Sequence, residues 1–347
     1  MKIVSYLPEK AMLRPEIRSC HGKFIWLVVL GCCWLSGGSA ASGQHVTYRL
    51  KWLRNMSTAG DLLADHLGYF KEAGLDVDIK PGGPERDPIR ELELGYADFG
   101  VASADQVVRA MAKGSPVVVV AQLFQANPLQ WIYRQKRLTV KRPEDLRNRT
   151  IGVTFGKNDE MILMTLLARA QIPVSQVRLY GVRLDYTPFF KNRVDLWPVY
   201  INTQGVEIGN RLQSAGEPAA FLNPAEFGVR FVANAVVTTQ NTVDAHSDLV
   251  RRFVNAVLRG WRQAMDPANG EQVIEAVRRF DRDTAANVLQ QQLKATRNLV
   301  QPDPDVAVGT IDRNGWRQTE TIMLEQHQIP KPVNVVDRLK SFVPEKR

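Results

Sequence analysis

The chain has 347 residues, of which 44% are hydrophobic, and a formal net charge of +9 at neutral pH. This length and hydrophobic content suffice for a full core, which at such a size is normally divided between two domains. The charge is mildly basic, but no lysine and arginine run with interleaved aromatic residues is present, which argues against a nucleic-acid partner. We expect a globular protein with a solvated charged surface, and an anionic ligand stays open.

The first 41 residues have the features of an export signal peptide. Basic residues up to Lys23 precede the apolar run 24–30, and small residues follow at 36–41. The apolar run is shorter than the roughly 20 residues of a membrane-spanning helix. We therefore expect cleavage near Ala40 or Ala41 and a periplasmic protein.

All three cysteines, Cys20, Cys32 and Cys33, lie in this leader. The folded part is thus expected to hold no disulfide, thiol nucleophile or thiolate metal site. Segment 29–32 also resembles a bacterial lipobox, in which a lipid attached to the cysteine anchors the mature protein to a membrane. A lipid anchor on Cys32 and a free periplasmic protein both stay open.

From residue 46 onward, short apolar runs alternate with helical segments, the pattern of an α/β protein with parallel strands. In the first part we expect strands at 48–53, 77–80, 99–102 and 117–123, with helices at 61–72, 88–94 and 105–113. A crossing strand at 131–134 leads to a short helix from Pro143, strands at 150–153, 177–180, 196–199 and 219–222, and a helix at 159–170. A second crossing strand, 229–238, precedes helices from Ser247 and at 272–280, 284–299 and 312–326.

This order predicts one domain interrupted by another. We expect lobe 1 to comprise residues 46–130 and 238–347, and lobe 2 to be the inserted segment 131–237. Two connections side by side would form a hinge, and a ligand would sit between the lobes.

Motifs for catalysis and metal binding are missing from the sequence. The five histidines are scattered, and no HExxH, GxSxG or Walker-type sequence is present. Acidic pairs such as Asp159-Glu160 are more typical of a helix N-terminus, where they interact with the helix dipole. We expect no catalytic residue, no metal site and no cofactor.

Aromatic and amide residues gather at the expected strand ends, as in a cleft for a flat polar ring. Aromatic faces stack on a planar ligand, and amides donate and accept hydrogen bonds in fixed directions. These candidate ligand-binding residues are Trp52, Asn55, Phe155, Tyr186, Trp197, Tyr200, Asn202 and Gln204. Any one of the aromatic residues is better explained by burial in the core, so the prediction depends on the set.

A turn and two hydroxyl groups extend this set. The turn Phe155-Gly156-Lys157-Asn158 opens an expected helix, where free backbone N–H groups can hold an anion or a carbonyl group, and Lys157 would add charge. Thr58 and Ser103 stand ahead of two other expected helices, and we include both among the ligand-binding residues.

Five blocks carry a resemblance to one protein family: KWLRN (51–55), GYFKEAGLDV (68–77), GYADFGVASA (95–104), VDLWPVYINT (194–203) and NPAEFGV (223–229). In these blocks the chain is similar to the thiamine-precursor-synthase-like family of periplasmic binding proteins. The resemblance implies a two-lobed type II periplasmic binding protein fold, each lobe a doubly wound sheet with flanking helices, joined by a two-strand hinge. Exported members deliver pyrimidine thiamine precursors, and in related branches sulfonates, nitrate or flavin, to ATP-driven importers.

By position, the resemblance implies that Trp52 and Asn55 line one lobe, residues 155–158 and Tyr186 the other, and residues 197–204 the rim. Pyrimidine-binding relatives often carry Glu where this chain has Gln204, and Glu226 is the carboxylate that would compensate. The implied partners are a small-molecule ligand and the permease and ATPase of an importer, and we expect a monomer. A pyrimidine thiamine precursor is the expected ligand, with riboflavin, a sulfonate or nitrate as alternatives.

The same family includes fungal enzymes that build the pyrimidine from pyridoxal phosphate and their own histidine. The resemblance places Ala102 and Gln106 where those enzymes carry the cofactor lysine and the donor histidine, and residues 230–234 where they carry a cysteine-rich iron motif. Neither the Schiff base nor the metal site can form with these residues. We therefore expect a solute-binding protein and no enzyme; a synthase-like enzyme and a ligand-binding sensor module are the alternatives.

Overall fold

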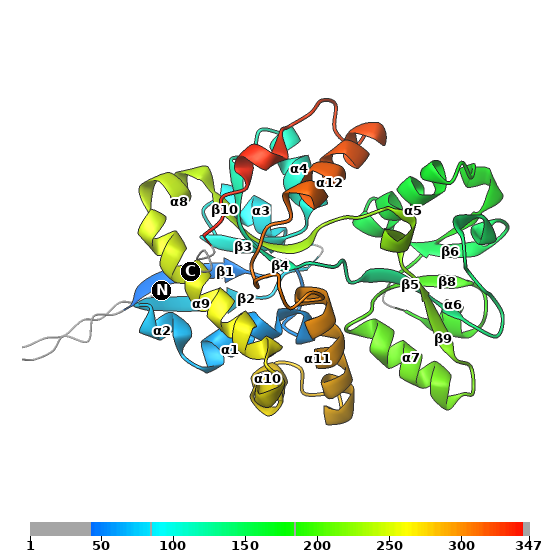
Figure 1. Cartoon of the computed structure of the whole chain (residues 1–347), viewed down its shortest axis with the longest axis horizontal. Helices are drawn as coiled ribbons and strands as arrows, with labels where there is room; N and C mark the ends of the chain where they lie inside the picture. Colours follow the sequence, from blue (N-terminus) through cyan, green and yellow to red (C-terminus); the bar gives the residue numbers. More distant parts are fainter. Residues whose placement is uncertain (1–42, 84, 184, 343–347) are drawn as a thin grey trace, which may run out of the picture. The chain divides into compact units, whose positions relative to one another are not determined.

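The computed structural model describes residues 43–342, apart from Pro84 and Leu184. The expected signal peptide and Cys32 lie outside the described residues. The described part of the chain forms two five-stranded mixed sheets with helices packed against them (Figure 1). The predicted α/β class is confirmed.

The first sheet has the strand order β2-β1-β3-β10-β4. Its strands are β1 (Gln44–Arg49), β2 (Leu75–Lys80), β3 (Phe99–Ala102), β4 (Val117–Phe124) and β10 (Ala233–Thr239). Strands β2, β1 and β3 run parallel, whereas β10 lies antiparallel between β3 and β4. A strand from late in the chain thus completes a sheet begun at its start.

The second sheet has the strand order β7-β6-β8-β5-β9. Its strands are β5 (Leu129–Arg134), β6 (Thr150–Val153), β7 (Arg178–Gly181), β8 (Leu196–Tyr200) and β9 (Ala219–Leu222). Strand β6 is parallel to β7 and β8, and β5 is antiparallel to β8 and β9. The chain therefore enters this sheet at β5 and returns to the first sheet at β10.

Helices connect the strands and cover the sheets. The α-helices are α1 (Ala59–His66), α2 (Tyr69–Glu72), α3 (Pro88–Glu93), α4 (Ala104–Ala112), α5 (Asn158–Arg169), α6 (Thr187–Phe190), α7 (Gln204–Ser214), α8 (Gln240–Ala245), α9 (Ser247–Met265), α10 (Gly270–Arg278), α11 (Ala286–Val300) and α12 (Arg313–Glu325). The 3-10 helices are η1 (Met56–Thr58), η2 (Pro143–Leu146), η3 (Val174–Gln176), η4 (Pro224–Phe227), η5 (Pro267–Asn269) and η6 (Val335–Arg338). No helix among the described residues combines the length and apolar character needed to cross a bilayer.

The long helix α9 supplies much of the core of the first sheet. The ring of Phe253 stacks on Phe99 with their centroids 3.8 Å apart, and the ring of Tyr48 meets Phe253 edge-on at 5.0 Å. Helix α1 packs against α9 (Figure 1). A Cβ on Gly60 would come within 2.2 Å of the Trp261 ring, so this close approach requires glycine.

Two local departures from the expected elements shape the candidate site. Strand β1 ends at Arg49, and the residues after it form a loop that leads into η1. The side-chain oxygen of Asn55 accepts a hydrogen bond from the backbone N–H of Ser57 at 3.0 Å, which caps η1 and ends the extended segment. The expected helix 61–72 is divided at Gly68, whose φ of 74° lies in the left-handed region.

Candidate ligand-binding site

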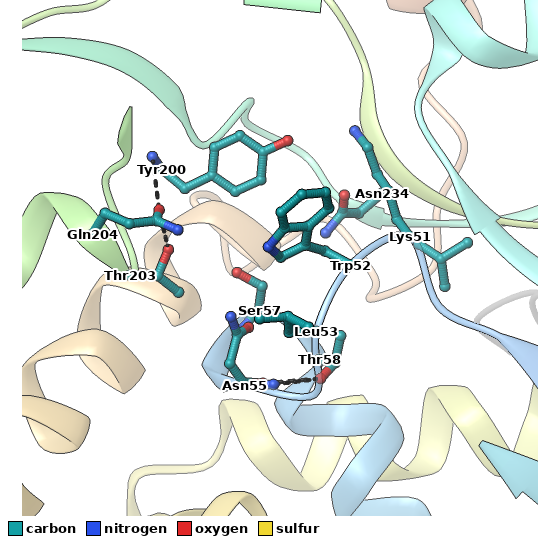
Figure 2. A pocket seen from close by; sticks show the side chains of 11 residues that line it. Lys51, Trp52, Leu53, Asn55, Ser57, Thr58, Tyr200, Thr203, Gln204 and Asn234 are labelled. Carbon is teal, nitrogen blue, oxygen red and sulfur yellow. Dashed lines mark hydrogen bonds between the residues drawn. The ribbon is translucent and has the colours of Figure 1, made fainter. Parts of the chain in front are cut away.

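A pocket lies where the segments after β1 and β8 meet β3 and β10. It is lined by Lys51, Trp52, Leu53, Asn55, Ser57, Thr58, Val101, Tyr200, Thr203, Gln204 and Asn234 (Figure 2). Its empty space is about 380 Å³, including the part open to solvent. In α/β sheets, ligands bind outside the carboxyl ends of the strands, the position that the segments after β1 and β8 occupy here. This location makes the pocket the candidate site.

Two aromatic side chains reach the pocket from different sheets. Trp52 lies in the loop after β1, and Tyr200 is the last residue of β8. Both are partly buried, and both line the pocket (Figure 2). Their ring faces suit a planar ligand.

Gln204 is the first residue of α7, and its side-chain oxygen already accepts two hydrogen bonds within the protein. Its Oε1 accepts hydrogen bonds from the backbone N–H of Tyr200 at 3.3 Å and from the hydroxyl of Thr203 at 2.7 Å. These contacts fix the orientation of the amide, so Nε2 is the end that can donate to a ligand.

Asn234 of β10 is a pocket residue that the sequence analysis did not select. Its side chain is 5% exposed, and its Oδ1 is buried with no hydrogen-bond partner among the described residues. Its φ of 38° is positive, which is uncommon outside glycine and is best tolerated by Asn and Asp. Nothing in the strand-like pattern around position 234 signals this conformation. A buried acceptor without a partner costs about 1–3 kcal/mol, and a bound ligand would remove that cost.

The pocket carries little charge. Lys51 is the one charged side chain among the described residues that line it, and it is partly buried. Glu226, the carboxylate considered as a substitute for the missing Glu at position 204, is exposed in η4 and does not line the pocket. The site therefore offers amides and hydroxyls to a ligand, with no carboxylate on its described wall.

The structure places Trp197 away from the pocket. Its side chain is 1% exposed and packs in the interior of the second sheet, near Tyr186 at a ring-centroid distance of 5.8 Å and near Phe189 at 6.3 Å. Residues on one strand alternate between faces, so Trp197 and Tyr200, three positions apart on β8, point to opposite sides. Neither Trp197 nor Tyr186 lines the pocket, and ligand contact by either stays a prediction.

The turn 155–158 also lies outside this pocket, and one of its expected free donors is occupied, as is the donor of the residue before it. The backbone N–H of Thr154 donates to the carboxylate of Asp159 at 2.6 Å, and that of Gly156 donates to Glu160 at 2.7 Å. Gly156 and Lys157 line a second pocket beside Arg109, while Phe155 is 57% exposed. The acidic pair in the first turn of α5 thus binds back to the residues that precede the helix, and Asn158 is the first residue of that helix.

Two further predicted residues have structural contacts. Ser103 caps α4 and is 2% exposed, with its hydroxyl bound to Asp105. Asn202 is fully buried, and its Nδ2 donates to the hydroxyl of Ser57 at 3.1 Å and to that of Thr296 at 3.0 Å. Asn202 therefore joins the end of β8 to η1 and α11. Of the predicted set, the pocket brings together Trp52, Asn55, Thr58, Tyr200 and Gln204.

No group of three or more His, Cys, Asp or Glu side chains in the described part of the chain is arranged to hold a metal ion. The lining of the pocket offers no cysteine or histidine either. What the described walls can do chemically is bind a ring face and hydrogen-bond its edge.

Comparison with known proteins gives relatives of two kinds. The chain is 26% identical over 322 residues to the riboflavin-binding protein RibY of Chloroflexus aurantiacus, covering 87% of this chain and 86% of that protein. It is 23% identical over 305 residues to the formylaminopyrimidine-binding protein of Halalkalibacterium halodurans, covering 86% and 90%. A shorter match of 223 residues, 25% identical, is to the 4-amino-5-hydroxymethyl-2-methylpyrimidine phosphate synthase of Legionella pneumophila, covering 62% and 68%.

Among solved structures, the chain is similar to the periplasmic aliphatic sulphonate binding protein SsuA of Escherichia coli. The TM-score is 0.66 at 15% sequence identity, over 88% of this chain and 95% of that one. This likeness confirms the predicted periplasmic binding protein fold. The family model described as NMT1/THI5 like matches residues 55–269. The chain therefore belongs to the NMT1/THI5-like family, as its sequence blocks predicted.

Proposed function

We propose that this protein is the extracytoplasmic solute-binding component of an ATP-driven importer and holds a planar heteroaromatic molecule between Trp52 and Tyr200. The observation that carries the proposal is that these two aromatic side chains, one from the loop after β1 and one from the end of β8, line one pocket. A ring bound there would contact both sheets at once. Binding energy would then favour a closed arrangement of two lobes, 46–130 with 238–347 and 131–237.

A pyrimidine thiamine precursor is the proposed ligand. The pocket wall pairs two aromatic rings with the amides of Asn55, Gln204 and Asn234, which suits a neutral ring with polar edges. The full-length relative from Halalkalibacterium halodurans is named for a formylaminopyrimidine. Riboflavin, another planar heteroaromatic molecule, is the alternative, since another relative is named for it. For a sulfonate or nitrate, Lys51 is the one opposite charge among the described residues that line the pocket.

We propose that binding is not followed by a reaction. The relatives matched over most of their length are named as binding proteins, and the synthase match is shorter. Ala102, which the resemblance aligns with the cofactor lysine of the enzymes, is a fully buried strand residue with no amine to form a Schiff base. The proposed partners are a permease and an ATPase, and the proposed site of action is the periplasm.

A thermal-shift screen of the purified protein tests this proposal. A ligand that binds only the native state raises the melting temperature. The panel would hold 4-amino-5-hydroxymethyl-2-methylpyrimidine, formylaminopyrimidine, thiamine, riboflavin, pyridoxal phosphate, taurine and nitrate. We expect a saturable rise with a pyrimidine and recovery of that compound unchanged by chromatography. A rise with taurine or nitrate only, or conversion of the pyrimidine, would contradict the proposal.

A further inference from the structure

We infer that Asn234 hydrogen-bonds the edge of the bound ring. Through these hydrogen bonds it selects a heterocycle carrying an amino group next to a ring nitrogen. This inference rests on the proposed function, because it assumes a planar ligand in the pocket. The starting observation is that a polar side chain, 5% exposed, lines the pocket and leaves its Oδ1 without a partner. Buried polar groups normally have hydrogen-bond partners, so this exception needs an explanation.

The backbone holds the Asn234 side chain in place. Its neighbours pair with β4, Ala233 opposite Phe124 and Ala235 opposite Gln122, so position 234 is anchored on both sides. The φ of 38° at Asn234 is kept although it is unfavourable for most side chains. Figure 2 shows the amide beside the indole of Trp52, the ring proposed to cover one face of the ligand. A residue with a positive φ that lines a pocket and has an unpaired amide oxygen among the described residues is suited to recognise a ligand.

The chemistry of a primary amide defines the matching ligand edge. An amide offers one acceptor and two donors in one plane, and it pairs with an amino group and an adjacent ring nitrogen through two hydrogen bonds, as Asn does with adenine. A 4-aminopyrimidine presents this pair. A sulfonate or nitrate has acceptors only and would leave the Asn234 oxygen unpaired. The opposite wall adds the Nε2 donor of Gln204, whose own oxygen is already bound to Tyr200 and Thr203.

The test compares two ligands that differ only at this edge. Isothermal titration calorimetry would measure the binding of 4-amino-5-hydroxymethyl-2-methylpyrimidine and of the analogue with a methyl group in place of the 4-amino group. The variant is Asn234→Gly, because glycine accepts the positive φ without strain and removes only the amide. Asn192→Gly is the matched control, since Asn192 has a φ of 57° and is exposed in a turn away from the pocket lining.

For the unchanged protein and for Asn192→Gly, we expect the amino compound to bind about 10- to 100-fold more tightly than the methyl compound. In Asn234→Gly the two compounds should bind with affinities that differ by no more than about threefold, because the amide that hydrogen-bonds the amino group is gone. If Asn234→Gly keeps the affinity ratio of the unchanged protein, the inference is overturned while the proposed function stands. The same holds if the variant loses affinity for both compounds equally, because the ratio is then unchanged. If the unchanged protein binds neither compound, the pyrimidine proposed as ligand is wrong, and the inference fails with it.

Discussion

The side-chain amide of Asn202 donates a hydrogen bond to the hydroxyl of Ser57 across 3.1 Å, although 145 positions separate the two residues in the sequence. Asn202 follows β8 of the second sheet, and Ser57 lies in η1 after β1 of the first. The same Nδ2 reaches Thr296 of α11 at 3.0 Å. One buried side chain therefore connects the two segments that carry Tyr200 and Trp52 into the pocket.

We predict that Asn202→Ala loosens this connection. Two hydrogen bonds are lost, at about 0.5–1.5 kcal/mol each. Hydrogen exchange of the backbone amides in segments 55–58 and 293–297 should become faster, and ligand affinity should fall several-fold. Asn210→Ala is the control, because Asn210 donates to Gln291 at an exposed position and its loss should change exchange little. Equal exchange in Asn202→Ala and the unchanged protein would show that the connection does not hold these segments.

Trp52→Ala should weaken ligand binding with little loss of stability. The indole is partly buried and supplies a ring face on the pocket wall. Removal of one stacking partner from a bound base costs about 1–3 kcal/mol, which is roughly 5- to 150-fold in affinity. Calorimetry measures the affinity, and thermal melting checks the fold. Tyr96→Ala removes an aromatic side chain that is 65% exposed and should leave binding unchanged. Unaltered affinity in folded Trp52→Ala would remove Trp52 from the site.

Trp197→Ala should give the opposite result. Its side chain fills the interior of the second sheet, so truncation leaves a cavity and costs about 3–5 kcal/mol of stability. Denaturant unfolding measures this cost. The affinity of the fraction that remains folded should be unchanged, because Trp197 does not line the pocket. A stable Trp197→Ala protein with weakened binding would restore the contact that the sequence analysis proposed.

Asp61 should make stability depend on pH. It is fully buried in α1, and burial raises its pKa from 3.8 to about 7, opposed by the hydrogen bond that Tyr48 donates to it at 2.9 Å. Between about pH 4 and 7 the folded chain holds this proton and the unfolded chain does not. Stability is therefore lost as pH rises through that window, by roughly 4 kcal/mol at most.

The variant Asp61→Asn keeps the acceptor for Tyr48 and removes the titration. The free energy of unfolding of both proteins would be measured from pH 4.5 to pH 8. We expect the unchanged protein to lose stability relative to Asp61→Asn as pH rises, with the difference levelling off above about pH 7. A difference that stays constant over this range would show that Asp61 keeps the same protonation state throughout.

Most of the fold could be predicted from hydrophobic periodicity. Strands 99–102, 150–153 and 219–222 have the predicted bounds, since each is a short apolar run between turn residues. Helix α7 was missed because Gly205, Gly209 and Asn210 lower its helix propensity, and its stability depends on packing of Ile208 and Leu212. The first strand was predicted at 48–53, whereas β1 spans Gln44–Arg49. The apolar pattern continues to Leu53, but Asn55 caps η1 and the chain has left the sheet before it.

The candidate site was predictable only in part. Trp52 and Trp197 have the same chemistry, but Trp52 lies partly buried in the loop after β1, whereas Trp197 lies on β8 with its side chain in the interior. Asn234 could not be selected from the sequence. It stands out by its positive φ and by an unpaired side-chain oxygen, and a residue pattern shows neither. The sequence could not show that Glu160 accepts the N–H of Gly156 in the turn 155–158, and a ligand contact by this turn stays a prediction.

We propose above all that the pocket between Trp52 and Tyr200 binds a pyrimidine without changing it. The most direct measurement is calorimetric titration of the purified protein with 4-amino-5-hydroxymethyl-2-methylpyrimidine, followed by chromatography of the recovered ligand. We predict saturable binding of one molecule per chain, loss of this binding in a protein carrying both Trp52→Ala and Tyr200→Ala, and full recovery of the intact pyrimidine. Absence of binding by folded protein, or binding that survives loss of both rings, would contradict this proposal.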